Sequence, residues 1–242
     1  MNNKEITKYI VAFTYGEGYL GFHGKNCRFE ANNISENRDY IEWRADILRN
    51  VTGLSMRENL NPGQNRKPFI KTTTHTHPKF TDVHEKLYLN GKKVIDPHYL
   101  KLLDWESLAI WYMDDGSIRP VIRPYKNKVY YFTPVPNIAT NCFSYGDNLL
   151  IKKAIKENLG IEFNIHKHSL NKRGEQTYIL CLLSSSLHKF LDGVEKYIQP
   201  SFRYKLNPYE KLHRDVDGEI VRTLEKSNEL DRNDLVQEEI LE

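Results

Sequence analysis

Apolar residues recur along the first hundred positions in a pattern that predicts alternating helices and short strands. In chain order, the predicted elements are a helix at 6–17, strands within 19–31, a helix at 36–51, a strand at 67–76 and a helix after 78. The first helix stops at a Gly-Glu-Gly turn, and Ser35 is a suitable N-cap for the helix that starts at residue 36. This half therefore mixes helices with short strands.

The same order of elements restarts near residue 104. The predicted elements are a helix at 104–116, strands at 129–133 and 138–144, a helix at 147–159, strands at 162–169 and 176–183, and a helix at 185–198. Asp104 and Asp147 are suitable N-caps for two of these helices. Each half thus follows the order αββαββα, and a period of about 100 residues indicates a duplicated domain. We expect an α+β chain with two pseudo-symmetric halves, residues 1–100 and 104–210.

Charge is distributed unevenly along the chain. The formal net charge is +3, but residues 215–242 hold ten acids and three bases and so carry −7. Residues 1–214 therefore carry +10, and a body this basic suits a polyanion such as nucleic acid. Charge alone leaves a solvated basic surface as the alternative. We expect the acidic tail, 215–242, to be a frayed helix or disordered.

Membrane and disulfide-stabilised proteins are excluded by composition. No apolar run approaches the ~20 residues that span a bilayer, and the N-terminus is not that of a secretory signal peptide. Cys27, Cys142 and Cys181 lie far apart, which indicates reduced structural thiols. We therefore expect an intracellular protein, in the cytoplasm of a bacterial or phage-infected cell or in an organelle matrix.

The two helices that open the halves end alike, with an acid followed by a glycine. The first ends IVAFTYGEG and the second LAIWYMDDG, so Glu17 and Asp115 occupy corresponding places. An acid there is unfavourable, because the helix macrodipole already places negative partial charge at the C-terminus. If the helices pack as a pseudo-twofold pair, both carboxylates reach one end of the seam and favour Mg²⁺. Ordinary helix-end acids are the alternative for either motif alone.

These two segments resemble the signature helices of the LAGLIDADG homing endonucleases in their monomeric, two-motif form. The resemblance extends to HEKLYLNGKKVIDPHYLKLLDWESLAIWYMDDGS and IQPSFRYKLNP, and covers residues 5–210. It implies two LAGLIDADG helices at the interface of the halves and a saddle of antiparallel sheets over the major groove of double-stranded DNA. It also implies a monomer, without membrane or protein partners, that breaks both strands at a long asymmetric site with Mg²⁺ or, in its place, Mn²⁺.

The resemblance assigns a metal site to the ends of the two motifs. Glu17 and Asp115 match the metal-binding acids, while Gly16 and Asp114, one place earlier, match backbone-carbonyl contributors near the metal. The first motif departs from the usual pattern, since Thr14, Tyr15 and Gly16 stand where an aliphatic residue, Asp and Ala are more common.

Three polar residues outside the motifs match further catalytic positions of the family. Lys93 in NGKKVI and Lys205 in FRYKLN resemble the basic residues that face the scissile phosphates, one in each half. Their physical role is to position water or to offset developing charge. Asn141 in IATNCF matches a polar position that orders water. The alternatives are a solvated surface lysine for Lys93 and a strand-edge asparagine for Asn141.

Basic and polar residues alternate with apolar ones on the predicted strands, which leaves one face for DNA. The expected DNA-contacting residues are Lys71, Thr73, His75, His77, His166 and His168 on strands, and Arg119, Arg123, Lys126 and Lys128 in an extended basic loop at 119–128. A solvent-exposed sheet face and a floppy loop are the alternatives. A zinc site at the two first-half histidines is not favoured, because no further ligands have suitable spacing.

Two other functions are compatible with the same pattern. A non-cutting intron maturase or DNA-binding protein could share this fold, although binding alone does not require acids directed at phosphate. A purely structural basic protein would bind DNA weakly and without sequence preference. An intein origin is not expected, because the chain starts at Met without flanking splicing-domain sequence.

Overall fold

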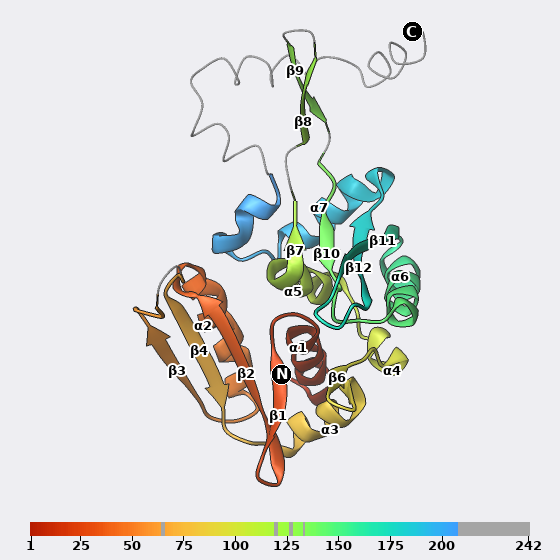
Figure 1. Ribbon diagram of the computed structural model, residues 1–242. Coiled ribbons are helices and arrows are strands. Elements are labelled where there is room, and N and C mark those ends of the chain that lie inside the picture. The colour runs from red at the N-terminus through yellow and green to blue at the C-terminus, as the bar shows by residue number, and fades with distance from the viewer. Residues whose placement is uncertain (64–65, 119–120, 126–127, 133, 208–242) are drawn as a thin grey trace.

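The computed structural model describes residues 1–63, 66–118, 121–125, 128–132 and 134–207 (Figure 1). The acidic tail at 215–242, Arg119 and Lys126 lie outside these residues. None of the helices in the described part of the chain is long and apolar enough to cross a membrane.

The first half is a four-stranded antiparallel sheet covered on one face by helices. Its elements are α1 (Asn3–Tyr15), β1 (Tyr19–His23), β2 (Asn26–Ile34), η1 (Ser35–Asn37), α2 (Arg38–Arg49), β3 (Leu54–Asn59), β4 (Phe69–Thr74) and α3 (Pro78–Leu87). The strand order is β1-β2-β4-β3, and α2 and α3 pack against the sheet. Alternation along β4 buries Ile70, Thr72 and Thr74 against these helices and leaves the opposite face polar.

A short connection joins the halves. It consists of the hairpin of β5 (Tyr88–Leu89) and β6 (Lys92–Lys93), followed by α4 (Pro97–Leu100). Asn90 and Gly91 form the hairpin turn with φ of 51° and 73°, the left-handed conformation that two-residue hairpins require. The turn fixes the register of the strand that ends at Lys93.

The second half repeats the first. Its elements are α5 (Trp105–Asp115), β7 (Gly116–Ser117), β10 (Asn137–Ala139), α6 (Tyr145–Leu159), β11 (Phe163–Leu170), β12 (Gln176–Leu182), η2 (Ser184–Ser186), α7 (Leu187–Glu195) and η3 (Pro200–Lys205). The strand order β7-β10-β12-β11 is that of the first sheet, element for element. The duplicated αββαββα organisation with two antiparallel sheets is therefore confirmed.

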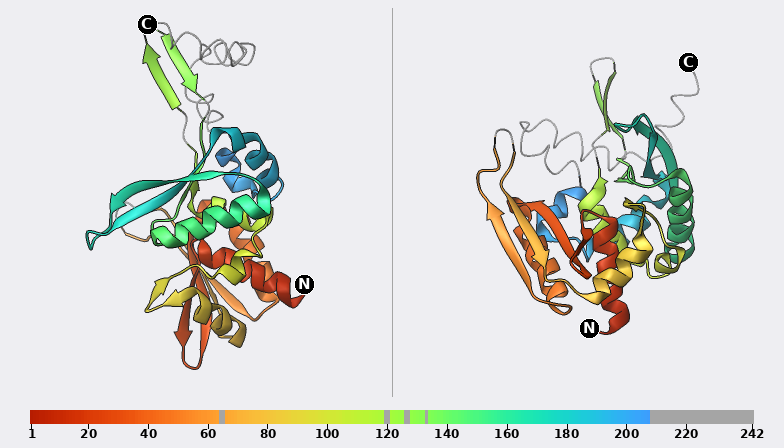
Figure 2. Two further views of the ribbon diagram at one scale, coloured as in Figure 1. Left: turned by 90° about the vertical axis from the view of Figure 1, so that its right-hand side faces the viewer. Right: turned by 60° about the horizontal axis from the view of Figure 1, so that its bottom comes forward.

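One hairpin has no counterpart in the first half. Among the described residues, strands β8 (Val121–Tyr125) and β9 (Lys128–Phe132) pair with each other and with no further strand, and they project from the body between β7 and β10 (Figures 1 and 2). The predicted strand at 129–133 therefore lies outside the main sheet in its described part, 129–132, and the predicted loop at 119–128 is strand in its described parts. The strand predicted at 138–144 ends at Ala139, because a turn leads from there into α6.

Two predicted helix caps are wrong and one is confirmed. Ser35 opens the short turn η1, and α2 starts three residues later without a side-chain cap. Ser144, not Asp147, caps α6; the Ser144 hydroxyl accepts from the Asp147 N–H at 3.1 Å, and the Asp147 carboxylate accepts from the Ser144 N–H at 3.0 Å. Asp104 caps α5 as predicted, accepting from the Ser107 N–H at 2.9 Å. Strand β3 was not predicted.

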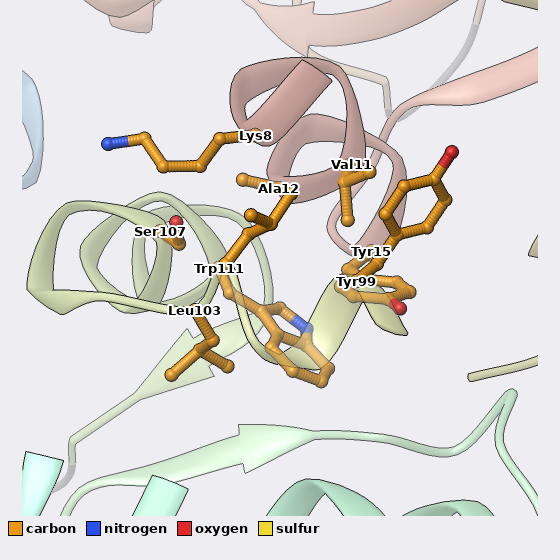
Figure 3. Close-up of a pocket in the computed structure, with 9 residues that line it drawn as sticks. Lys8, Val11, Ala12, Tyr15, Tyr99, Leu103, Ser107 and Trp111 are labelled. Carbon is orange, nitrogen blue, oxygen red and sulfur yellow. The ribbon is translucent and has the colours of Figure 1, made fainter. Parts of the chain in front are cut away.

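Helices α1 and α5 pack against each other at the centre of the molecule. Residues 10–15 of α1 and residues 107–113 of α5 are all buried, so both helices are buried on every side in these segments. Ala12 of α1 approaches α5, and the rings of Tyr15 and Trp111 lie 5.5 Å apart (Figure 3). A small, mainly apolar crevice borders this seam, with Tyr99 and Leu103 on its other side. The seam thus belongs to a core shared by both halves.

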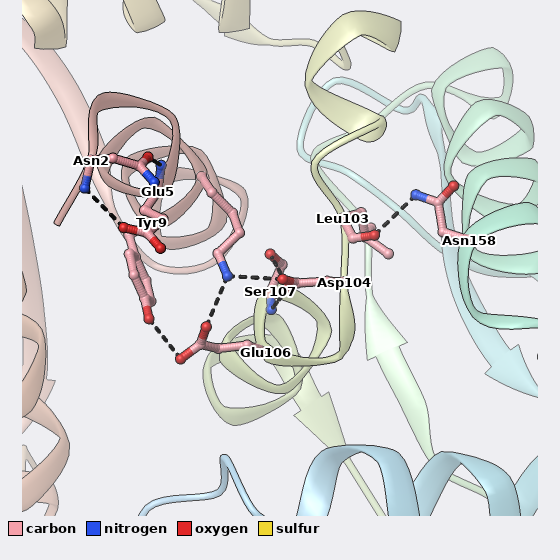
Figure 4. A network of polar contacts seen from close by, with 9 residues as sticks. Asn2, Glu5, Tyr9, Leu103, Asp104, Glu106, Ser107 and Asn158 are labelled. Atoms are coloured by element: carbon pink, nitrogen blue, oxygen red, sulfur yellow. Dashed lines mark hydrogen bonds and ion pairs between the residues drawn. The ribbon is translucent and has the colours of Figure 1, made fainter.

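A polar network joins α1 to the N-terminus of α5, at the opposite end of α5 from Asp115. Lys8 Nζ donates to Asp104 Oδ2 and Glu106 Oε2, both at 2.8 Å, and the Tyr9 hydroxyl donates to Glu106 Oε1 at 2.7 Å (Figure 4). Both acids lie at the N-terminus of α5, where negative charge is favourable. The network therefore links α1 to the start of α5.

The last described turn, η3, returns to the first half. The Ser201 N–H donates to Asp39 Oδ2 at 2.9 Å, and the Phe202 ring meets the Tyr40 ring edge-on at 5.3 Å. The C-terminal turn of the second half is thus attached to α2 of the first.

Candidate active site

The acidic ends of α1 and α5 touch. The backbone N–H of Glu17 donates to Asp114 Oδ2 at 3.1 Å. A Cβ at Gly16 would lie 2.2 Å from the same oxygen, so only glycine permits this approach. Asp115 follows directly in the chain, and the predicted pairing of the two motifs therefore brings three carboxyl groups to one end of the seam.

These carboxyl groups are held in an environment that opposes their charge. Burial, followed by the nearby charge of Asp114, raises the pKa of Glu17 to about 7 and that of Asp115 to about 6. Burial also raises the pKa of Asp114. Glu17 keeps part of its side chain in solvent, so water can reach the site from that side. A cation at this point would relieve the mutual repulsion.

Two lysines lie on the C-terminal carbonyls of the motif helices. Lys93 Nζ donates to the Gly16 carbonyl at 2.9 Å, and Lys205 Nζ donates to the carbonyls of Tyr112 and Met113 at 3.1 and 2.5 Å. Both cations face the negative ends of the helix dipoles. Burial lowers the pKa of Lys93 and lowers that of Lys205 to about 8. The two halves thus place matching lysines beside the acids.

Asn33 and Arg44, which sequence reasoning missed, connect Glu17 to a buried charge. The Asn33 amide donates to Glu17 Oε2, and Arg44 Nη2 donates to Asn33 Oδ1. Arg44 is 0% exposed and lies against the rings of Phe29 and Tyr40, at 5.7 and 5.2 Å. Its charge lowers the pKa of Glu17, partly offsetting the effect of burial.

A sequence signal for Arg44 did exist. It stands at helical spacing within the apolar stripe of α2, formed by Tyr40, Ile41, Ala45 and Leu48. An arginine in such a stripe is buried and needs a partner. Its Nε and Nη1 atoms, and Oδ1 of Asp114, are sealed from solvent without a hydrogen-bond partner in the described part of the chain.

The donor set fits a hard divalent cation. Carboxylate oxygens of Glu17 and Asp115 and the Gly16 carbonyl are all oxygen ligands, which Mg²⁺ prefers. Within the described residues, no three His, Cys, Asp or Glu side chains gather closely enough to hold a metal by themselves. Such an ion would therefore need backbone carbonyls, water and substrate oxygens to complete its shell.

Asn141 takes a different place from Asn33. Its amide nitrogen lies 3.2 Å from Nδ1 of His168, and both side chains are exposed. Asn33, at the end of β2, meets Glu17, whereas Asn141, in the turn after β10, meets a strand residue of β11. The polar residue that contacts a motif acid is thus the one that sequence reasoning missed.

The predicted DNA-contacting residues are only partly on strand faces. Lys71 and Thr73 lie on the polar face of the first sheet, and His166 is exposed on β11. Strand β4 ends at Thr74, so the predicted common strand face of His75 and His77 is wrong. His75 is exposed beyond the strand, and His77 caps α3, its Nδ1 accepting from the Lys79 N–H at 3.2 Å. Arg123 and Lys128 belong to the β8–β9 hairpin.

Comparison with known proteins gives consistent matches. The model of the LAGLIDADG DNA endonuclease family matches residues 16–190, more than half of the chain. The cytochrome b mRNA maturase bI2 of Debaryomyces hansenii is 33% identical over 222 residues, which cover 86% of this chain and 77% of the maturase. The DNA endonuclease I-ChuI of Chlamydomonas applanata is 26% identical over 221 residues, covering 84% of this chain and 95% of I-ChuI.

The chain is also similar to a RecA protein over half of that protein's length, and to a solved homing endonuclease structure over most of its length. The RecA protein of Mycolicibacterium flavescens is 24% identical over 221 residues, and the chain spans only 50% of the length of that relative. The solved structure of the homing endonuclease I-WcaI bound to its DNA recognition sequence has a TM-score of 0.63 and 21% identity, covering 84% of this chain and 86% of that one. At this identity the likeness concerns the fold.

Proposed function

The chain belongs to the LAGLIDADG DNA endonuclease family, and on this premise we propose that it is a monomeric, site-specific endonuclease that cuts both strands of duplex DNA. The single observation that supports cutting, beyond binding, is the meeting of the two motif ends through Glu17 and Asp114. This contact gathers the carboxyl groups at one end of the α1–α5 seam, where they could hold the metal of a phosphodiester hydrolase. A protein that only bound DNA would not need carboxylates clustered beside phosphate.

Glu17 and Asp115 would hold Mg²⁺ or Mn²⁺ together with the Gly16 carbonyl. The metal would act as a Lewis acid and make bound water a stronger nucleophile. Asn33 fixes one oxygen of Glu17, and Lys93 fixes the Gly16 carbonyl, so these ligands are oriented in advance. Lys93 and Lys205 also supply positive charge beside the place where the scissile phosphates would lie.

The polar faces of the two sheets would contact the major groove. Lys71, Thr73 and His75 would do so from the first half, and His166 and His168 from the second, because all five are at least partly exposed. For Arg119, Arg123, Lys126 and Lys128 the proposal rests on the basic sequence of the β8–β9 region. His77 stays in the proposal through its other ring nitrogen, because only Nδ1 caps α3 and the side chain is partly exposed.

Cleavage of a selected target tests the proposal. A pool of duplexes with a randomised core is selected by binding in EDTA, and the enriched sequence is placed in a plasmid. We expect Mg²⁺ to linearise this plasmid, with Glu17→Gln and Asp115→Asn binding it normally but not cutting it. Glu36→Gln, which changes an exposed acid paired with Lys67, is the matched control. Cutting that survives either acid variant, or that proceeds in EDTA, contradicts the proposal.

A second function is favoured by one observation, the 33% identity to a maturase. A maturase on this fold would bind its nucleic acid without needing Glu17 and Asp115 for cleavage. Binding of the selected duplex without cutting in either Mg²⁺ or Mn²⁺ would favour this reading over the endonuclease.

A further inference from the structure

An ionic triad occupies the polar face of the first sheet. Arg28 Nη2 lies 2.6 Å from Glu30 Oε1, and Lys71 Nζ lies 2.6 Å from Glu30 Oε2. Arg28 and Glu30 are two residues apart on β2, and β4 places Lys71 opposite Asn32, the next outward residue. All three side chains are partly exposed, at 30%, 23% and 44%. The triad is therefore built into the sheet and accessible from outside.

Glu30 is unusual in this position. The register of β1 to β4 places Tyr19, His23, Arg28, Glu30, Asn32, Ser55, Arg57, Lys71 and Thr73 on the outward face. Glu30 is the one acid at the outward positions of these four described strands. Its hydrogen bond to Lys71 holds its pKa below the usual range, so it is a carboxylate at neutral pH. A carboxylate cannot lie beside a phosphate without strong repulsion.

The chemistry of a carboxylate limits what Glu30 can recognise in the major groove. It only accepts hydrogen bonds, and the exocyclic amino group of cytosine is the donor that Glu and Asp ordinarily meet there. Arg28 and Lys71 can only donate, and guanine O6 and N7 are the acceptors that suit them. The ion pairs hold all three side chains in place before DNA arrives, which reduces the entropic cost of binding.

We infer that Glu30 is a specificity-determining residue that accepts from a cytosine amino group, with Arg28 and Lys71 donating to neighbouring guanine. The inference rests on the proposed DNA-binding function and adds a base preference to it. Lys71 thus reads a base edge and does not serve as a phosphate anchor.

Base selection with a randomised duplex pool tests this without any metal. Wild type, Glu30→Gln and Glu58→Gln are each used to select duplexes in EDTA, and the enriched pools are sequenced. We expect wild type to enrich cytosine at one position. Glu30→Gln should enrich adenine there, because a glutamine amide pairs with adenine N6 and N7, and the preference should change by ~10-fold or more. All other positions should stay the same.

Glu58→Gln is the matched control. It removes the same charge from β3 of the same sheet, which β4 separates from β2, but Glu58 pairs with Ile70, on the face opposite to Glu30, and forms an ion pair with Arg38 of α2. Its selected sequence should equal that of wild type. A third variant, Glu30→Ala, should lose the cytosine preference without gaining adenine, so the test does not depend on a single substitution.

The outcomes separate the inference from the function on which it rests. If Glu30→Gln and Glu30→Ala tighten binding to all duplexes equally and leave the consensus unchanged, Glu30 only reduces the positive charge of the face, and the inference is overturned. A wild-type consensus without a cytosine that responds to Glu30 overturns it as well. If wild type enriches no sequence at all, the proposed site-specific function fails instead.

Discussion

The backbone N–H of Glu17 is hydrogen-bonded to the carboxylate of Asp114, and this contact joins the ends of the two central helices. It depends on a glycine at residue 16, because any Cβ there would lie 2.2 Å from Asp114 Oδ2. Replacing that glycine with alanine must push the two helix ends apart or rotate the aspartate away.

We therefore expect Gly16→Ala to destabilise the protein by ~1–3 kcal/mol, as overpacking typically does. Chemical denaturation measures the effect, and cleavage of the selected plasmid should fall with it. Gly146→Ala is the control, since its Cβ would meet nothing closer than 3.7 Å. Equal free energies of unfolding for the two variants would show that a Cβ at residue 16 fits beside Asp114 without strain.

Arg44→Met should destabilise the protein strongly. The substitution leaves the Asn33 side-chain oxygen without its buried donor and removes the nearby positive charge from Glu17 and Asp114, which should cost ~1–3 kcal/mol. Arg49→Met, on the same helix but exposed and paired with Asp46, should change the free energy of unfolding by less than ~0.5 kcal/mol. Similar values for both variants would contradict the role given to Arg44.

Stability of the protein in EDTA should fall as pH rises through the range in which Glu17 and Asp115 titrate. Folding raises the pKa of Glu17 from 4.5 to about 7 and that of Asp115 from 3.8 to about 6. Between these values the folded state binds more protons than the unfolded state, so the free energy of unfolding decreases with increasing pH.

Thermal unfolding in EDTA from pH 4 to pH 8 measures this slope. Glu17→Gln should flatten it, because that side chain no longer titrates, while Mg²⁺ should raise the melting temperature most at pH 8, where the acids are charged. Identical pH profiles for wild type and Glu17→Gln would be incompatible with the raised pKa of Glu17.

The network around Lys8 should affect stability and not chemistry. Lys8→Met removes hydrogen bonds to two carboxylates and should cost ~1–3 kcal/mol. The cleavage rate well below the melting temperature should stay at the wild-type level, because these contacts lie away from Glu17 and Asp115. Lys153→Met, in an exposed pair with Glu157, should leave both quantities unchanged. A slower rate for Lys8→Met would mean that the network helps to align the acids.

The duplication could be predicted from the sequence because the signals that reveal it lie close together in the chain. Helix ends, acids and turn glycines are adjacent in the chain, so the repeated order and the correspondence of Glu17 with Asp115 follow from pattern alone. The strand β7 has only two residues and carries no alternation to detect. For this reason the sequence predicts the hairpin strand at 129–133 as part of the main sheet, where the structure has β7.

The surroundings of the acids were harder to predict, because they depend on contacts between distant segments. Asn33 reaches Glu17 across 16 residues, and Lys205 reaches the end of α5 across 92 and 93. For Asn33 the sequence marks only a polar residue, and the packed elements bring it to Glu17, whereas Lys205 is predicted beside the site only through the family resemblance. The apolar stripe around Arg44 is the exception, since its pattern alone indicates burial.

The attachment of η3 to α2 has a consequence for synthesis. The lysine that covers the carbonyls of Tyr112 and Met113 is translated 92 or more residues after them, which takes roughly 5–20 s at ordinary ribosome speeds. Until then α5 lacks its cation, and Ser201 and Phe202 have not yet bound Asp39 and Tyr40. A nascent chain thus carries both acids before Lys205 can cover the end of α5, and the proposed endonuclease activity should require a chain translated through η3.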